Sequence, residues 1–179
     1  MRYFTRELWL GLQKSEERTQ CTERFNRAIN DYVAQLTSLE SRLKPEVYKF
    51  FAEEDVHDGE LLDLVIEDGS RPAPLSQPPR PWKASKEHPV AVKLSVLDAY
   101  DRFVWTLRYK TVRRILVNFP SDEPLFHRGG AGFGDWGHHE LTDCGDGFLR
   151  HEVLFASGSE MVFEFKELSV ERQPRSSHS

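Results

Sequence analysis

Cysteine is scarce in this sequence of 179 residues, and that scarcity excludes several classes of small protein. Cys21 and Cys144 are the two cysteines, and neither belongs to a CxxC pair. A disulfide framework or a zinc ribbon needs more cysteines at closer spacing. Two cysteines without such a partner are typical of a reducing compartment, so we expect a cytoplasmic protein.

Long hydrophobic runs are missing as well. No stretch approaches about 18 consecutive apolar residues, and Glu7 interrupts the start before any run of signal-peptide length. We therefore expect neither a membrane span nor a secretory signal. Hydrophobic residues make up 39% of the chain and aromatic residues 12%, which is enough for the core of one domain.

The net charge of −5 is divided unevenly along the chain. Residues 91–120 hold six Lys or Arg against two Asp or Glu, whereas residues 121–170 hold ten acidic residues against three basic ones. An acidic second half argues against nucleic acid as the ligand and favours a basic protein partner. The alternative is an ordinary solvated sheet face. The predicted binding residues are Asp135, Trp136, Glu140, Asp143 and Asp146.

Residues 1–55 have the spacing of a helical region. Thr5 can cap a short helix and Ser15 a longer one, and Pro45 suits the first turn of a third. In the longer helix, apolar residues at steps of three and four trace a single stripe. The stripe consists of Cys21, Phe25, Ile29, Tyr32, Val33, Leu36, Leu39 and Leu43.

From residue 56 the apolar period changes from that of a helix to that of a strand. Strands are expected at 60–67, 90–97, 103–109, 112–119 and 136–141, followed by a hairpin at 148–166. Residues 69–89 hold six of the ten prolines and should form an extended loop, and residues 171–179 should be a disordered tail. The sequence therefore predicts an α+β fold: helices packed on an antiparallel sheet of about six strands spanning 56–170, in one folded unit.

The hairpin is the clearest local feature. A three-residue loop that ends in Gly158 sets Val153 opposite Met161 on an apolar face, and sets Arg150 opposite Glu164 on a wetter face. We expect the long helix to cover the apolar face. The helix residues expected against it are Phe25, Ile29, Val33 and Leu36.

A histidine and an aspartate stand together where the helical region enters the sheet. A His–Asp pair can perform acid–base chemistry, so a hydrolase using His57 and Asp58, with His138 or His139 and a metal, is the alternative functional hypothesis. No nucleophile or second acid is tied to the pair by spacing. We therefore interpret Asp58 and the following Gly59 as a structural turn.

Two other motifs carry little chemistry. Residues 132–137 spell GxGxxG, but a dinucleotide site needs a strand before the glycines and a helix after them, and neither is expected here. His127, His138, His139, Glu140 and Cys144 lack the spacing of a zinc site, and adjacent strand residues share a face only at a bulge. We expect no metal and no cofactor.

Three parts of the chain resemble a bacterial family of unknown function. These are the Tyr-Phe-Thr start in residues 1–7, the His-Asp turn in 56–62, and the tryptophan strand and hairpin in 136–140 and 151–158. The resemblance implies helices followed by an antiparallel sheet, and no established activity. Some related sheet domains resemble immunity proteins of bacterial toxin systems, which implies a toxin as the partner. The loop at 69–89 is longer than the family pattern.

Overall fold

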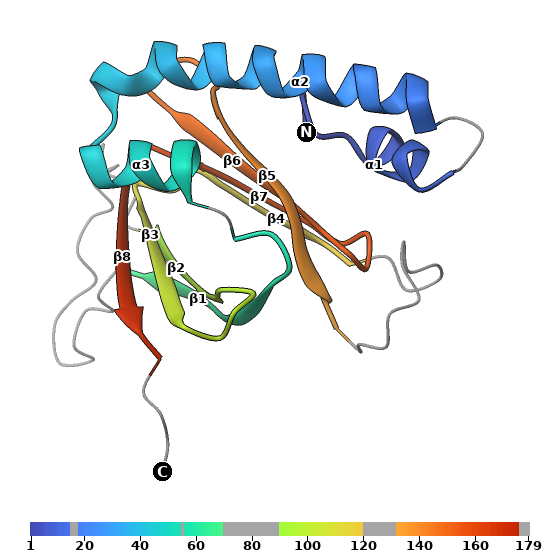
Figure 1. Cartoon of the computed structure of the whole chain (residues 1–179). Helices are drawn as coiled ribbons and strands as arrows, with labels where there is room; N and C mark the ends of the chain where they lie inside the picture. The colour runs from blue at the N-terminus through green and yellow to red at the C-terminus, as the bar shows by residue number, and fades with distance from the viewer. Residues whose placement is uncertain (15–17, 55, 70–89, 120–131, 176–179) are drawn as a thin grey trace, which may run out of the picture.

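The structure is a computed structural model that describes residues 1–14, 18–54, 56–69, 90–119 and 132–175. Within these residues, three α-helices precede one eight-stranded sheet in which neighbouring strands pair antiparallel (Figure 1). The helices are α1 (Arg6–Gln13), α2 (Arg18–Leu39) and α3 (Pro45–Glu53), with a short 3-10 helix, η1 (Glu40–Arg42), before α3. The strands are β1 (Gly59–Asp68), β2 (Val90–Leu97), β3 (Phe103–Lys110), β4 (Arg114–Asn118), β5 (Asp135–Asp143), β6 (Leu149–Phe155), β7 (Glu160–Phe165) and β8 (Glu167–Pro174). The α+β class is confirmed, but the sheet has eight strands rather than about six.

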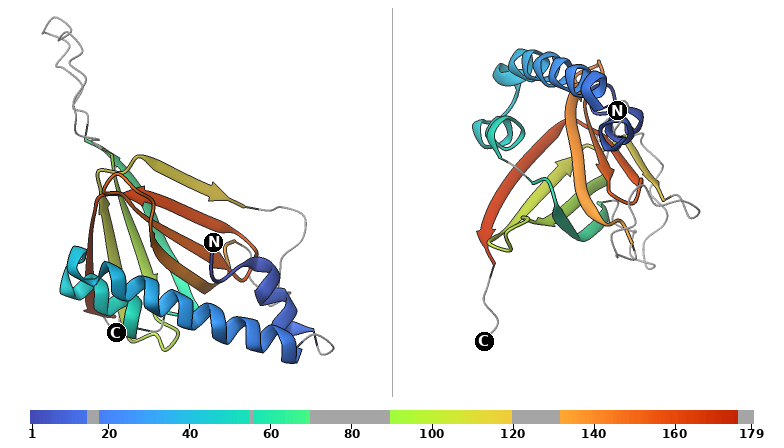
Figure 2. Two further views of the ribbon diagram at one scale, coloured as in Figure 1. Left: turned by 90° about the horizontal axis from the view of Figure 1, so that it is seen from above. Right: turned by 45° about the vertical axis from the view of Figure 1, so that its right-hand side comes forward.

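The sheet consists of two four-stranded halves joined at a narrow seam. Strands β4, β7, β6 and β5 form the first half-sheet, and β1, β2, β3 and β8 form the second. At the seam, Gly59 pairs with Trp136 and Glu60 with Asp135, and the pairing of β1 with β5 ends there. Lys166 is the second link, because this single residue separates β7 in one half from β8 in the other. The half-sheets diverge from these links, as Figures 1 and 2 show, and enclose the core.

The helix boundaries follow local signals. Thr5 is the N-cap of α1, and its hydroxyl accepts a hydrogen bond of 3.2 Å from the Leu8 N–H. Pro45 begins α3, where its fixed φ is already helical and its missing N–H costs nothing. Ser15, the expected cap of α2, lies outside the described residues. Helix α2 lies across β5 and α3 packs beside β8 (Figure 1).

The predicted stripe on α2 is partly wrong. Cys21, Tyr32 and Leu36 are buried, but Ile29 is 37% exposed and Val33 is 54% exposed. At about 100° per residue, Ile29 and Val33 turn onto the flank of the helix, away from the buried stripe. The apolar spacing alone does not show which side of the stripe is buried. That depends on how the helix lies on the sheet.

The hairpin has the predicted register. Val153 pairs with Met161 and Arg150 pairs with Glu164, and Gly158 has the positive φ (83°) that the turn requires. A one-residue slip would carry the apolar side chains to the other face, so the buried face defines the pairing. The order of β6 and β7 in the sheet is therefore a consequence of local sequence.

The second half-sheet and α3, rather than α2, cover the apolar face of the hairpin. Tyr109 of β3 lies with its ring centroid 4.9 Å from those of both Phe163 and Phe165. Phe51 of α3 meets the His151 ring edge-on at 5.0 Å. The expectation that α2 covers this face is wrong, because the sheet bends back upon itself and covers its own strands.

Strand β8 occupies part of the region expected to be a disordered tail. It pairs with β3 over its full length, from Lys110–Glu167 to Phe103–Pro174. Leu168 and Val170 are buried, but residues 171–175 are exposed and are held by main-chain hydrogen bonds. No apolar pattern marks such residues as a strand. The expected loop at 70–89, and residues 129–131 of the glycine-rich loop, lie outside the described residues.

Replacing Gly59 by alanine is expected to lower the free energy of unfolding by about 1–3 kcal/mol. A Cβ atom on Gly59 would lie 2.6 Å from the carbonyl oxygen of Leu97 and 2.8 Å from that of Val56, so the backbone must shift. The positive φ in this turn belongs to Asp58 (61°), so the constraint on Gly59 is close approach rather than conformation. Urea unfolding of Gly59→Ala measures the loss, and an unchanged midpoint would contradict this account of the turn.

Candidate functional site

His57 and Asp58 form a structural turn whose side chains face two different hollows. His57 Nδ1 lies 2.9 Å from Asp58 Oδ1, and the Asp58 N–H donates to the carbonyl oxygen of Trp136. His57 borders a pocket beside β5, whereas Asp58 borders a hollow beside the turn between β2 and β3. No serine, threonine or cysteine is among the described residues that line either space. The hydrolase hypothesis therefore gains no side-chain nucleophile here.

A bulge at Gly137 precedes His138 and His139, which then alternate across β5 in regular pairing with Leu154 and Val153 and still border the same pocket. The pairing of β5 with β6 shifts between Trp136 and His138. The His138 ring lies 5.3 Å from the His57 ring, while the His139 ring packs 5.1 Å from Phe51. The two side chains thus diverge from adjacent positions and still border one space.

We call this space the histidine pocket. It has a volume of about 230 Å³ and lies between α2, the turn before β1, and β5. Its walls combine apolar rings with imidazoles: they include Phe4, Phe25, Ile29, His57, His138 and His139. Aromatic walls with few convergent polar groups are the usual composition of a small-molecule site.

A series of three hydrogen-bonded side chains leads from the core to this pocket: Tyr109 and His151 are fully buried, and His139 is half-buried. The Tyr109 hydroxyl lies 2.6 Å from His151 Nδ1, and His151 Nε2 lies 3.2 Å from His139 Nδ1. Burial lowers the pKa of His139 to about 3 and that of His151 well below its ordinary value, so both rings are neutral at pH 7. Burial raises the pKa of Tyr109, which keeps its proton. His151 is the satisfied core histidine that its place on an apolar face indicates.

The protons shared by Tyr109, His151 and His139 have one favourable arrangement. The Tyr109 O–H donates to His151 Nδ1, His151 Nε2–H donates to His139 Nδ1, and His139 carries its own proton on Nε2. In the reverse arrangement, the Tyr109 O–H would have no acceptor among the described residues. A buried donor without a partner costs about 1–3 kcal/mol. The hydrogen bonds of Tyr109 and His151 therefore fix the tautomer of His139.

The five predicted binding residues do not form one surface. Trp136 and Glu140 are fully buried, whereas Asp135, Asp143 and Asp146 are exposed. Asp135 begins β5 and Asp143 ends it, so about 27 Å of strand separates them. Asp143 also forms an ion pair with Arg42 at 2.7 Å. Alternation alone does not explain the split, because the bulge after Trp136 changes the phase of β5: Trp136 pairs with Phe155 and Glu140 with Glu152, so the two buried residues lie on opposite faces of the strand.

Glu140 is buried because it binds the first residues of the chain. Its carboxylate accepts hydrogen bonds from the backbone N–H groups of Arg2, Tyr3 (2.8 Å) and Phe4 (3.2 Å). Glu152 lies directly opposite Glu140 in the β5–β6 pair, and its Oε1 atom lies 2.9 Å from the α-amino group of Met1. These donors compensate two carboxylates that would otherwise repel each other across the strands.

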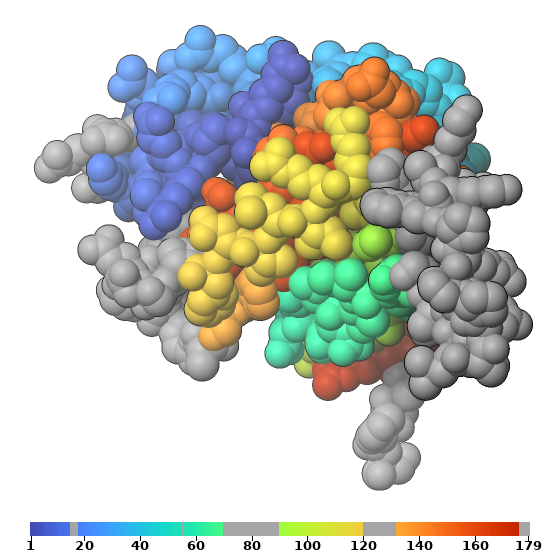
Figure 3. Space-filling model, turned by 180° about the vertical axis from the view of Figure 1, so that it is seen from behind, coloured from blue at the N-terminus to red at the C-terminus, as the bar shows by residue number. Residues whose placement is uncertain are grey.

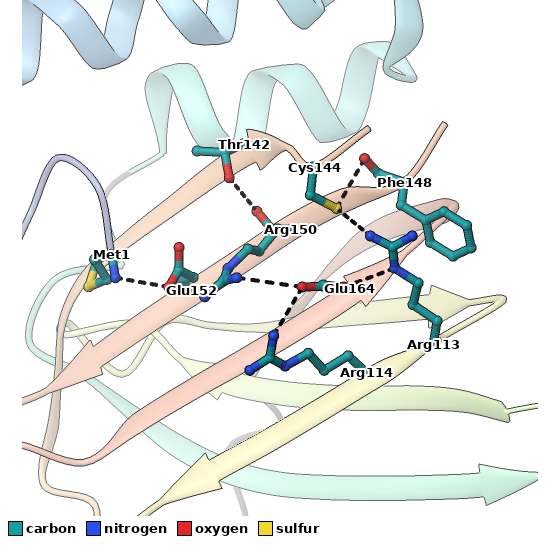
Figure 4. Close-up of polar contacts among 9 residues, drawn as sticks. All are labelled: Met1, Arg113, Arg114, Thr142, Cys144, Phe148, Arg150, Glu152 and Glu164. Carbon is teal, nitrogen blue, oxygen red and sulfur yellow. Dashed lines mark hydrogen bonds and ion pairs between the residues drawn. The ribbon is translucent and has the colours of Figure 1, made fainter. Parts of the chain in front are cut away.

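Arginine side chains enclose Glu164 on the outer face of the hairpin (Figure 4). Arg113 Nε lies 2.8 Å from the carboxylate, Arg150 lies at 3.5 Å and Arg114 at 3.6 Å. Glu164 is only 8% exposed, so the face expected to be wet is largely covered here. Arg113 contributes to the cover by lying over the Phe148 ring, 4.1 Å from its centroid. The Arg150–Glu164 pair thus belongs to a network and is not an isolated surface ion pair.

Cys144 lies beside this network but is not an activated nucleophile. Its sulfur contacts Arg113 at 3.5 Å and the carbonyl oxygen of Phe148 at 3.4 Å (Figure 4). Burial raises the pKa of the thiol, and the nearby Glu164 carboxylate raises it further, against the lowering effect of Arg113. A thiol with a raised pKa stays protonated at neutral pH and reacts slowly.

Strand β1 has an edge that is free of other described strands for most of its length. Beyond Glu60, no described strand pairs with the side of β1 that faces away from β2. The strand carries four carboxylates and no basic residue, and it exposes three large apolar side chains. The carboxylates are Glu60, Asp63, Glu67 and Asp68, and the apolar side chains are Leu62, Val65 and Ile66.

Strand β4 lies on the same face of the molecule as β1, as Figure 3 shows in yellow and green. Strand β4 is a terminal strand of the sheet and also carries exposed apolar residues. The strands β1 and β4, with Phe119 just after β4, supply six of the nine large apolar side chains that are exposed in the described part of the chain. Because adjacent residues alternate across each strand, Val65 and Ile66 point to opposite faces of β1, and each face of that strand carries part of this apolar surface.

An acidic hollow of about 440 Å³ lies at the start of the β1 edge. The carboxylates of Asp58, Glu60, Asp98, Asp101 and Asp135 line it. Three of them are already engaged: Asp58 contacts His57, the Asp98 carboxylate accepts hydrogen bonds from the backbone of Arg102 and Phe103, and Asp101 forms an ion pair with Arg175. Asp135 is thus the one predicted binding residue that lies next to the β1 edge.

No family model, no curated protein and no solved structure matches this chain. The geometry defines an α+β protein with one bent antiparallel sheet. Its two distinctive features are the acidic edge of β1, which has no described pairing partner beyond Glu60, and the histidine pocket. Among the residues that the structure describes, no set of three or more His, Cys, Asp or Glu side chains is arranged to hold a metal ion. None of the described helices combines the length and the apolar character needed to cross a membrane.

Proposed function

We propose that this chain is a non-enzymatic protein-binding domain whose partner adds an extended basic segment to the free edge of β1. The observation that carries the proposal is the unpaired edge at residues 62–68, with its carboxylates and exposed apolar side chains. An extended peptide can pair with such an edge through main-chain hydrogen bonds, and its alternate side chains then give specificity.

The composition of β1 supports a ligand for this edge. Edge strands that must stay unpaired usually carry lysine or proline, or are twisted away by a bulge. Strand β1 has neither residue, and its one irregularity, between Leu61 and Asp63, lies at the start of the free stretch. Four carboxylates favour lysine or arginine in the partner, and Leu62, Val65 and Ile66 favour apolar residues between them.

The charge distribution of the sequence indicates a basic partner, and the proposal retains it. The proposed binding site, however, is on β1 and not on β5. Trp136 and Glu140 are interior, and Asp143 and Asp146 lie at the far end of β5. A basic segment of a bacterial toxin is the partner that the resemblance to immunity proteins implies. Binding to β1 requires no catalytic residue on this chain.

The test uses a nine-residue peptide that alternates lysine with valine. Binding is expected to protect the backbone amides of residues 62–68 from hydrogen exchange and to weaken as salt is raised, because charge attraction is screened. The double variant Asp63→Lys with Glu67→Lys is expected to bind about tenfold more weakly. Both side chains lie on one face of β1, since they pair with Ser95 and Ala91 of β2.

The matched control makes the same charge change on β8, a terminal strand of the same sheet. Glu167→Lys with Glu171→Lys alters two exposed carboxylates there and is expected to leave peptide affinity unchanged. An equal loss in both double variants would show general charge attraction. That result, or a wild-type protein without amide protection at 62–68, would overturn the proposal.

A further inference from the structure

The histidine pocket is separate from the β1 edge and shares no described lining residue with it. One of its polar lining residues is His139, whose Nδ1 atom lies 3.2 Å from His151 Nε2. The other ring nitrogen, Nε2, has no hydrogen-bond partner among the described residues, and it is not among the buried polar atoms that lack one. Nε2 is therefore accessible from the pocket that the ring borders.

The protonation of His139 Nε2 is determined by the hydrogen bonds that Tyr109 and His151 form in the core. Because the Tyr109 hydroxyl donates to His151, and His151 donates to His139 Nδ1, the Nε2 atom of His139 carries a hydrogen. At His139 the pocket thus presents a hydrogen-bond donor of fixed position. A ligand satisfies this donor with an oxygen or nitrogen acceptor, rather than with a donor of its own.

The remaining walls define the body of the ligand. Phe4 and His138 stack with ring centroids 5.5 Å apart, and Phe25 lies 5.4 Å from the same imidazole. A cavity of about 150 Å³ lined by apolar side chains holds benzene, so 230 Å³ accommodates one ring with a small substituent. Glu54 stands at the pocket with Arg172 3.9 Å and Lys49 4.0 Å from its carboxylate, which leaves little net charge to attract an ion.

We propose that the histidine pocket binds a small uncharged molecule with one aromatic ring and a carbonyl acceptor, which receives a hydrogen bond from His139 Nε2–H. The ring lies against Phe4, Phe25 and Ile29, and the carbonyl points toward β5. Tyr109 and His151 are positioning residues, because they act through the tautomer of His139 and do not touch the ligand.

The experiment compares two probes of nearly equal shape, acetophenone and α-methylstyrene, in nuclear magnetic resonance titrations of the full chain. Acetophenone has the carbonyl acceptor and α-methylstyrene has a methylene group in its place. We expect saturable shifts confined to residues around the histidine pocket, and about fivefold tighter binding of acetophenone, the gain typical of one net hydrogen bond. The nitrogen shifts of His139 should show a protonated Nε2 and an unprotonated Nδ1.

Two variants of α2 test the place of binding. Ile29→Trp fills the pocket from a partly exposed position and is expected to abolish binding of both probes. Val33→Trp makes the same change one turn later, at an exposed residue that does not line the pocket, and is expected to retain binding. Loss of binding in both variants would overturn the assignment of the site.

Tyr109→Phe tests the tautomer. It removes the hydroxyl that donates to His151 and is expected to reduce the preference for acetophenone toward equality, while α-methylstyrene still binds. If this variant does not fold, the nitrogen shifts of wild-type His139 decide the same question. An unprotonated Nε2, equal affinity of the two probes for the wild-type protein, or no saturable binding would each overturn the proposal.

Discussion

Lowering the pH from 7 to 5 is expected to reduce the free energy of unfolding by about 3–4 kcal/mol, because two histidines must stay neutral in the folded core. Burial lowers the pKa of His139 to about 3 and holds that of His151 well below its ordinary value. In the unfolded chain each titrates near 6.5, so below that pH the unfolded state binds protons that the folded state does not. Stability is therefore complete above about pH 7 and falls by about 1.4 kcal/mol per histidine for each pH unit below 6.5.

Urea unfolding at pH 7, 6 and 5 measures this loss. His151→Gln removes one of the two titrating rings, so the slope of stability against pH should fall to about half, whatever the variant costs at pH 7. His57→Asn replaces a half-exposed histidine outside the Tyr109–His151–His139 series and serves as the comparison variant. Asp98, Asp143 and Glu152 have lowered pKa values and add to the loss mainly below about pH 4.5, where the unfolded carboxyls take up protons. Equal stability at pH 7 and pH 5 would contradict the neutral pair.

Glu140→Ala is expected to lower the free energy of unfolding by about 3–5 kcal/mol, as removal of one member of a buried charged network does. The substitution takes the acceptor from the N–H groups of Arg2, Tyr3 and Phe4, which lie in or beside the interior. It also leaves the Phe4 ring, which packs on Tyr32 and Phe25, without its backbone anchor. Glu140→Gln keeps one carbonyl oxygen as an acceptor and should lose less.

Asp143→Ala provides the comparison on the same strand. Asp143 is exposed and its partner Arg42 is also partly exposed, so this ion pair should contribute less than about 1 kcal/mol. Urea unfolding compares the variants, and hydrogen exchange follows the amides of residues 2–4, which should exchange faster in Glu140→Ala. Equal losses for Glu140→Ala and Asp143→Ala would show that the first residues of the chain are not held by β5.

The parts of the fold that could be predicted are those determined by residues close together in the sequence. The hairpin register follows from alternation across a turn that ends in Gly158, and the start of α3 follows from Pro45. The burial of α2 could not be predicted in full, because Ile29 and Val33 continue the same spacing as the buried residues. Strand β8 could not be predicted, because beyond Val170 it is held by the main chain of β3 rather than by its side chains.

The candidate sites depend on contacts between residues that are distant in the sequence. Tyr109 meets His151, and Glu140 meets Tyr3, through the bending of the sheet, and no local spacing connects either pair. Adjacent histidines at 138 and 139 did signal a possible site, but the pocket that both border is completed by α2 and the turn before β1, which is a tertiary feature. The free edge of β1 exists because β5 separates from it after Glu60, which no residue of β1 indicates.

Lys166 is the one residue between β7 and β8, so β8 can pair with β3 only after the first half-sheet has been synthesised. A chain is synthesised from its N-terminal end, so β1, β2 and β3 can pair as a meander while the later strands are still being made. The outer side of β3 receives β8 only after β4 to β7 exist, and until then it is an open edge that can pair with other chains. Pairing over such a separation is slow. Refolding from denaturant should therefore be limited by the docking of β8 on β3, the step that brings the two half-sheets together.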